Sequence, residues 1–448
     1  MEHQATKNFH LPNRFGFHYF PDCVHYTEKD IQRWLPAIKE INAHWLVLQS
    51  PINRAIPEEF IRRFSENDID LVIDFASPPS AQFDWHDLEL LLAFYGKWGA
   101  RYAIHNQRPN LRKTWPAGKW GDVHIIDSVI DEFIRFGSIC LENNIRPVFP
   151  LLTPGGDYWD LAFLKTALLK LKKEAPLLIQ NNFILSAAAW DWAKPLDWGI
   201  GGQASWPNVK PYKLPQGSQN QCGFRTYEWY GPIANEIFGK VIPILLLQAG
   251  VTNDPLDPAS GFQSAGLDKL LPIYHLLKGE NVFDTLDGSR LLSPVSSEVI
   301  GCCFFVISSD ADAYKDLCWF SPDGVRLPPA QSIYIAENAG QEKQVGANPV
   351  ESKPMDNFRH NRYILIAEDL QPEIPELLEL LHPYIEKFRP MIGSSIIEAK
   401  RSAMILAIAP SFGPEPSSFE QIKNNGSLVK VIRPSEIPAY LMEFENAN

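Results

Sequence analysis

Short apolar runs alternate with longer amphipathic segments along the first three quarters of the chain. The runs are almost entirely apolar, which is typical of β-strands that are covered on both faces. The longer segments carry apolar residues at helical spacing, as in residues 27–41, where Trp34 and Ile38 are four positions apart. Thr27, with Asp30 three residues later, predicts the start of this helix.

Eight strand-like runs occur before residue 311, and helical segments separate them. The runs cover residues 14–20, 44–51, 70–79, 101–110, 146–152, 182–190, 241–250 and 298–310. This alternation predicts a (β/α)₈ TIM barrel over residues 1–336. A doubly wound open sheet is the alternative, but the chain has no strand–Gly-x-Gly-x-x-Gly–helix fingerprint of that fold.

The last quarter of the chain has a different pattern. Residues 337–360 are polar with few large apolar positions, and we interpret them as a linker. Residues 361–448 then predict a small α/β domain, with strands at 362–369, 403–410 and 428–432, a helix at 374–388 and a short helix at 392–402. We find no catalytic pattern in this domain, and contact with a protein partner is one role that stays open for it.

The composition and net charge disfavour nucleic-acid, membrane and metal-dependent functions. The formal net charge of −12 disfavours a nucleic-acid partner. The longest apolar run is too short to span a bilayer, and the first residues lack the basic-then-apolar pattern of a signal peptide, so we expect a soluble, cytoplasmic protein with no membrane contact. The six cysteines form no CxxC pair, and we predict neither a metal site nor a cofactor.

Candidate chemistry follows from the barrel, because βα loops at the carboxyl ends of the strands carry the functional residues of such folds. The residues at the predicted strand ends are His18, Tyr19, Asp22, Gln49, Asp74, His105, Asn106, Gln107, Thr153, Trp190, Asp191, Trp192, Gln248, Ser308, Ser309 and Asp310. Amides, carboxylates and flat rings in one place suit a neutral polyhydroxylated ligand.

Two of these strand ends carry a family resemblance. The stretch "HNQRPNLRKTW", from His105 to Trp115, resembles the acid/base motif after strand four of the retaining (β/α)₈ glycoside hydrolases, Asn-Glu-Pro followed by Asn-Leu and a Trp. Gln107 stands in the place of the glutamate, and Arg108 is an extra residue. The stretch "LLLQAG" resembles the nucleophile motif after strand seven, with Gln248 in place of the second glutamate. A segment after the eighth run, containing Trp319, is similar to the closing segment of that clan.

The resemblance implies a site whose two catalytic glutamates are both replaced by glutamine. Retaining hydrolysis uses two carboxyl groups about 5 to 5.5 Å apart, one as acid and one as nucleophile. A glutamine side chain can supply neither group, although it has nearly the same shape and still forms hydrogen bonds. We therefore expect sugar binding without hydrolysis by this route.

Two other interpretations stay open. In one, the protein is an active glycosidase that uses other carboxylates, with Asp191 as the candidate catalytic residue and a loop or helix-capping aspartate as the alternative for it. In the other, the chain is a non-catalytic scaffold. The predicted ligand-binding residues are His18, Tyr19, Asp74, Asn106, Gln107, Asn110, Trp190, Asp191, Gln248 and Trp319.

Overall fold

The computed structural model of the chain separates into two compact units, Met1–Val345 and Gly346–Asn448. It describes residues 13–75, 77, 83–180, 183–251, 269–283, 291–338, 360–367, 370, 373–388, 390–399, 402–409, 428–438 and 441. Most of the predicted linker lies outside the described residues. No helix in the described part of the chain is both long and apolar enough to cross a membrane.

The first unit contains one parallel sheet that closes on itself. Its strands, in chain order, are β1 (Phe15–His18), β2 (Trp45–Gln49), β3 (Asp70–Phe75), β4 (Tyr102–His105), β5 (Arg146–Val148), β6 (Leu185–Trp190), β7 (Ile244–Gly250) and β10 (Val299–Phe304). They pair in the order β5-β4-β3-β2-β1-β10-β7-β6. A parallel bridge between Val148 and Ile184 joins the two edges. The predicted (β/α)₈ barrel is therefore confirmed, and the open doubly wound sheet is excluded for this unit.

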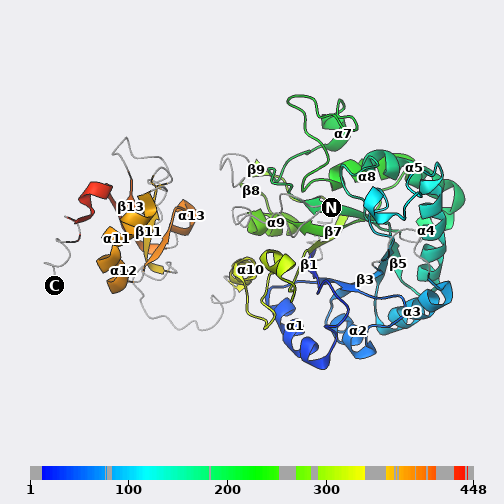
Figure 1. Cartoon of the computed structure of the whole chain (residues 1–448), viewed down its shortest axis with the longest axis horizontal. Coiled ribbons are helices and arrows are strands. Elements are labelled where there is room, and N and C mark those ends of the chain that lie inside the picture. The colour runs from blue at the N-terminus through cyan, green and yellow to red at the C-terminus, as the bar shows by residue number, and fades with distance from the viewer. Residues whose placement is uncertain are drawn as a thin grey trace, which may run out of the picture. The chain divides into compact units, whose positions relative to one another are not determined.

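Helices surround the strands, as Figure 1 shows. They are α1 (Glu28–Glu40), α2 (Glu58–Ser65), α3 (Trp85–Trp98), α4 (Ile125–Glu142), α5 (Asp160–Glu174), α6 (Pro176–Gln180), α8 (Tyr227–Phe238), α9 (Leu270–Leu277) and α10 (Pro328–Asn338). The start of α1 is as predicted, because Thr27 and Asp30 form a capping box there. The sequence pattern did not predict the short helix α7 (Gly202–Ser205), the turns η1 (Arg112–Thr114) and η4 (Asp312–Leu317), or the hairpin of β8 (Val282–Phe283) and β9 (Leu291–Leu292).

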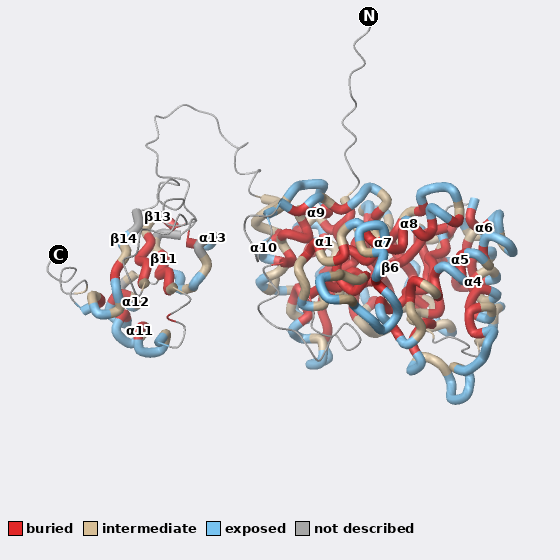
Figure 2. Tube along the Cα trace, turned by 90° about the horizontal axis from the view of Figure 1, so that it is seen from above, coloured by how far each residue is buried: buried red, intermediate tan, exposed pale blue. Residues whose placement is uncertain are grey.

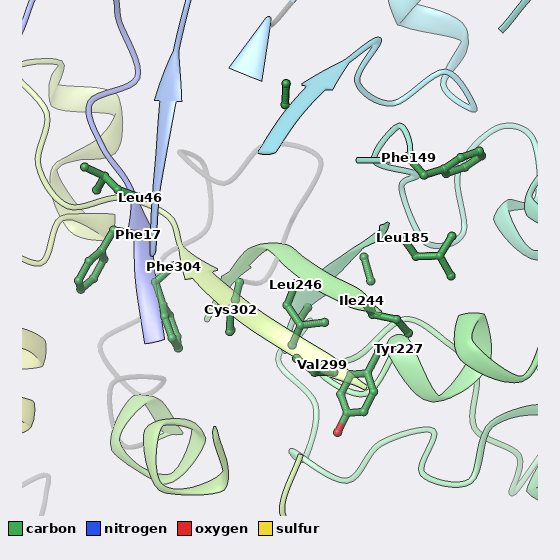
Figure 3. Packing of buried hydrophobic residues seen from close by; sticks show 14 of the residues in the cluster. Phe17, Leu46, Phe149, Leu185, Tyr227, Ile244, Leu246, Val299, Cys302 and Phe304 are labelled. Carbon is green, nitrogen blue, oxygen red and sulfur yellow. The ribbon is translucent and has the colours of Figure 1, made fainter. Parts of the chain in front are cut away.

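Two apolar layers explain the almost continuous apolar runs. Residues on the outward strand faces, such as Phe17, Leu246 and Phe304, pack against the helices in the main core (Figure 3). Residues on the inward faces fill the barrel and form a separate cluster that includes Trp45, Tyr102 and Leu247. Figure 2 shows the resulting concentration of buried positions along the strands and the inner helix faces.

Glycines in two neighbouring strands permit the close packing around Trp45 inside the barrel. A Cβ atom on Gly16 of β1 would lie 2.3 Å from both the Cβ and the backbone O of Trp45, so glycine here lets the backbone of β2 come close. A Cβ atom on Gly301 of β10 would lie 2.7 Å from the indole ring, so glycine there makes room for the ring itself.

The second unit holds a parallel sheet in the order β12-β11-β13-β14. Its elements are β11 (His360–Ile366), α11 (Ile374–Leu380), α12 (His382–Phe388), β12 (Met391–Gly393), α13 (Ile396–Ala399), β13 (Ser402–Ile408), β14 (Leu428–Ile432) and η7 (Pro434–Glu436). Alternate residues of β11 point to opposite faces, so Ile364 packs on Leu377 of α11 while Leu365 packs with Ala399 of α13. The small α/β domain is confirmed, but the predicted short helix at 392–402 begins with strand β12 instead.

Candidate functional site

Polar side chains from four strand ends gather at the carboxyl end of the barrel. We call His18, Asp74, Gln107, Arg108 and Gln248 the mouth cluster. Gln107 Nε2 donates a hydrogen bond to Asp74 Oδ2, and Arg108 Nη2 donates one to Gln248 Oε1 at 2.5 Å. The charge of Arg108 also acts on Asp74 and His18. The two glutamines therefore belong to one polar cluster, although Gln107 follows β4 and Gln248 lies in β7.

Asp74, the last inward residue of β3, supplies the single carboxyl group of the mouth cluster. Its side chain is only 1 % exposed, and Oδ1 has no hydrogen-bond partner among the described residues. Burial raises the pKa of Asp74 to about 7, although the hydrogen bond from Gln107 and the charge of Arg108 partly oppose this shift. Near neutral pH this carboxyl is consequently present in both protonated and ionised forms.

Arg108, the extra residue of the strand-four motif, reaches from the loop after β4 to the end of β7. Its φ angle of 58° lies in the left-handed region, as does the 59° of Asn106. Backbone hydrogen bonds hold this conformation, since Arg108 N donates to Leu151 O at 2.7 Å and Leu111 N donates to Arg108 O at 3.1 Å. Burial lowers the pKa of the guanidinium, which nevertheless stays charged.

The two histidines near the mouth are neutral at physiological pH. Burial lowers the pKa of His18 to about 4, and its Nε2 lies 2.6 Å from Leu247 O, so Nε2 carries the proton in this contact. Burial also lowers the pKa of His105 to about 4. His105 Nδ1 lies 2.9 Å from Ser77 Oγ, and its ring packs against Phe136 of α4. His105 is therefore a buried, hydrogen-bonded histidine that packs between β4 and α4.

The asparagines of the strand-four motif fasten loops. Asn106 Nδ2 donates to Glu132 Oε2 of α4 at 2.5 Å. Asn110 exchanges two hydrogen bonds with the Thr153 backbone, at 2.8 and 2.9 Å, and donates a third to Tyr158 O. Asn110 is fully buried and joins the loop after β4 to the loop after β5, which positions the segment that carries Gln107.

Asp191 follows β6 but its carboxylate is already engaged. Lys269 Nζ lies 2.5 Å from Asp191 Oδ2, and both side chains are buried. Lys269 also donates to Lys194 O at 2.9 Å. The ion pair joins the loop after β6 to the start of α9, and it favours the structural alternative for Asp191, whose catalytic role stays a prediction.

The predicted aromatic residues divide between two environments. The Tyr19 ring packs with Phe60 and Trp34, and the Trp319 ring packs with Phe17, so both lie in the layer between strands and helices, apart from the mouth cluster. Trp190 belongs instead to the barrel interior and is 1 % exposed. None of these three rings is an exposed platform for a sugar.

An aromatic pair that the sequence analysis missed lies at the mouth. The half-buried ring of Phe305 lies 5.3 Å from the His18 ring and 5.4 Å from the ring of Tyr314. Tyr314 is half-buried and close enough to Arg108 to act on its charge. The signal in the sequence was the aromatic residue directly after the eighth strand.

A cavity of about 590 Å³ opens at the carboxyl ends of β2 and β3. It is lined by Cys23, Gln49, Ser50, Pro51, Ile52, Asn53, Phe75, Ser77, Phe83, Asp84 and Asp87. Its mixture of amide, hydroxyl, carboxylate and apolar surface lies next to the strand that carries Asp74, and its volume is in the range of small-molecule sites.

The remaining carboxylates of the strand ends lie at the rim. His25 Nδ1 is 2.9 Å from Asp22, and its Nε2 is 3.1 Å from Asp310, so this histidine connects the loops after β1 and β10. The Asp310 side chain is 64 % exposed. Among the described residues, no group of three or more His, Cys, Asp or Glu side chains is arranged to hold a metal ion.

Comparisons with known proteins were made at three levels. No protein-family model matches the chain. No curated protein matches it either.

Solved structures that resemble the chain share about 8 to 11 % identity with it. A GH5 cellulase from an Icelandic hot spring isolate has a TM-score of 0.43 over 77 % of this chain and 91 % of its own, at 11 % identity. A GH39 β-xylosidase from Caulobacter crescentus has a TM-score of 0.40 over 73 % of this chain and 71 % of its own, at 10 % identity. A mutant of Saccharomyces cerevisiae Gas2p in complex with laminaritetraose and laminaripentaose has a TM-score of 0.38 over 75 % of this chain and 67 % of its own, at 10 % identity. The fold described above rests on the strand pairing of this chain itself.

Proposed function

We propose that the carboxyl end of the barrel binds a carbohydrate and does not hydrolyse it by the two-carboxylate route. The observation that carries the proposal is the contact between Arg108 and Gln248. The amide that stands in the nucleophile position accepts a hydrogen bond from a guanidinium, so a positive charge lies beside the place where a hydrolase holds an anion.

The chemistry of glycoside cleavage explains why this arrangement opposes hydrolysis. The transition state resembles an oxocarbenium ion, and hydrolases stabilise its positive charge with a nearby carboxylate. Here Gln248 is neutral and Arg108 is cationic, so the local field disfavours that charge. Gln107 cannot protonate a leaving oxygen, and its amide instead donates to Asp74.

Hydrogen-bonding capacity supports the binding half of the proposal. The mouth cluster combines two amides, a carboxyl and a guanidinium, and these groups match the hydroxyls of a polyhydroxylated ligand. The cavity of about 590 Å³ at the carboxyl ends of β2 and β3 has room for more than one hydroxylated ring. Phe305 and Tyr314 place aromatic surface beside the same groups.

The test combines binding and turnover on the purified full chain. A glycan array measures binding, and a panel of aryl glycosides measures hydrolysis. We expect binding of at least one glycan class and no release of aryl alcohol above the buffer rate. The Gln107→Glu/Gln248→Glu double variant is the matched gain-of-function test, because it restores both carboxyls at unchanged side-chain length. Absence of binding to any glycan would contradict the proposal and favour the scaffold interpretation.

A second function is favoured by one observation. The pKa of Asp74, raised to about 7, is that of a group able to donate and accept a proton near neutrality. Asp74 would then be the acid/base of a glycosidase with a different second group. Enzymatic cleavage of an aryl glycoside by the wild type, lost in Asp74→Asn and retained in Asp191→Asn, would establish this function in place of the first.

A further inference from the structure

Arg108 is a cation at the barrel mouth whose local partner is a neutral amide. Its guanidinium donates to Gln248 Oε1, and no carboxylate among the described residues forms an ion pair with it. The carboxyl of Asp74 acts on it electrostatically, but no hydrogen bond joins the two side chains. A desolvated charge without a close counter-ion destabilises the folded chain, which suggests that the charge of Arg108 serves binding rather than stability.

The backbone conformation of Arg108 is unusual and is held by hydrogen bonds. Arg108 occupies the left-handed region at φ 58°, which is unfavourable for a long side chain. Three hydrogen bonds anchor it there: from its own N–H to Leu151 O, and from Leu111 N and Thr114 Oγ1 to its carbonyl, at 2.7, 3.1 and 3.0 Å. The guanidinium is therefore held at one position over the end of β7, as expected for a binding residue rather than a surface cation.

The surroundings neutralise the charge of Arg108 only in part at physiological pH. His18 is neutral there, because burial lowers its pKa to about 4. Asp74 is a weak counter-ion, since burial raises its pKa to about 7 and its carboxyl accepts from Gln107.

We infer that Arg108 is the anion-recognition residue of the mouth, and that the carbohydrate bound there carries a carboxylate, sulfate or phosphate group. The inference deepens the proposed function and rests on it. Guanidinium groups bind such anions through paired, charge-assisted hydrogen bonds, for which the planar fork of arginine is well shaped. A ligand anion would supply the close counter-charge that Asp74 provides only in part.

The experiment compares acidic sugars with their neutral parents on the full chain. The probes are uronate-containing, sulfated and phosphorylated oligosaccharides, each paired with the unmodified oligosaccharide, and they show which anion is bound. The variants are Arg108→Gln and Arg108→Lys. The matched control is Arg112→Gln, which removes a charge from an exposed position of the same loop.

We expect the wild type to bind one acidic class about 10- to 100-fold more tightly than its neutral parent, the range for charge-assisted hydrogen bonds. Arg108→Gln should remove this preference, and its affinity for the neutral parent should stay within about threefold of the wild-type affinity. Arg108→Lys should keep part of the preference. The control should bind as the wild type does. The melting temperature of Arg108→Gln should fall only slightly, because the hydrogen bond to Gln248 is lost but no ion pair is broken; a large fall would assign Arg108 to structure and overturn the inference.

A second measurement separates the two proposals. Inorganic phosphate at constant ionic strength should raise the melting temperature of the wild type more than that of Arg108→Gln. Equal binding of acidic and neutral sugars, unchanged in Arg108→Gln, would overturn the anion role and leave carbohydrate binding standing. Failure of every sugar to bind, together with a phosphate effect confined to the wild type, would support the anion site and overturn the carbohydrate function. Failure of both would overturn both.

Discussion

Replacement of Asp74 by asparagine should stabilise the barrel increasingly as pH rises. In the unfolded chain an aspartate ionises near 3.8, whereas burial in the folded barrel raises the pKa of Asp74 to about 7. Between these values the folded state holds a proton that the unfolded state has released. The stabilising contribution is therefore complete below pH 3.8 and is lost as pH rises to 7.

The magnitude follows from the same two values. A difference between 3.8 and about 7, at 1.36 kcal/mol per pH unit, corresponds to about 4 kcal/mol in the free energy of unfolding. Between pH 5 and pH 8 the advantage of Asp74→Asn over the wild type should grow by about 3 kcal/mol. The changed hydrogen bond with Gln107 adds an offset that does not depend on pH.

Urea unfolding followed by tryptophan fluorescence measures this effect in the barrel alone. All 13 tryptophans lie between Trp34 and Trp319, so the second unit contributes no tryptophan signal. The matched control is Asp312→Asn, which removes the same charge from an exposed position after β10. A difference between Asp74→Asn and the wild type that stays constant from pH 5 to pH 8 would refute the reasoning about burial.

Three further changes test the structural contacts, each by urea unfolding at pH 7. Lys269→Ala leaves the buried Asp191 carboxylate without its ion-pair partner and should lower the free energy of unfolding by about 3 to 5 kcal/mol; a change under 1 kcal/mol would contradict a buried pair. Gly16→Ala forces a Cβ against the Cβ and backbone carbonyl of Trp45 and should cost about 3 kcal/mol or more, and Trp45→Leu in the same chain should not relieve it, because leucine carries the same Cβ and carbonyl. Asn110→Ala removes three buried hydrogen bonds and should cost about 2 to 4 kcal/mol, and an unchanged midpoint would show that water replaces them.

The sequence pattern predicted the barrel because its signals are local. Each apolar run is bounded by turn residues and followed by a helical period, and this holds for all eight barrel strands. Strand β12 was missed because three residues, Met391–Gly393, carry too little pattern to distinguish a strand from the start of the next helix.

The candidate site was predicted less completely, for reasons that particular residues make clear. Tyr19 follows His18, and neighbouring strand residues point to opposite faces, so the period of two already placed only one of them at the mouth. Lys269, which forms the ion pair with Asp191, is 78 residues away along the chain, and no local sequence pattern predicts this contact. Arg108 was visible only as an extra residue in the motif, because its reach to Gln248 depends on a left-handed backbone and on a contact across the barrel.

Closure of the barrel between β5 and β6 creates an uneven ring of hydrogen bonds. Strand β5 has three residues, and among the described residues one bridge, Val148 to Ile184, links it to the β6 side, whereas β6 and β7 pair from Leu185 to Trp190 with one register shift. This seam is the place where the cylinder opens with least loss of backbone bonding, and amide hydrogens there should exchange before those of β7. The residues of the mouth cluster belong to β1, β3, β4 and β7, or directly follow these strands. Local opening between β5 and β6 can therefore widen the barrel while the pairing of β1 with its neighbours β2 and β10 is kept.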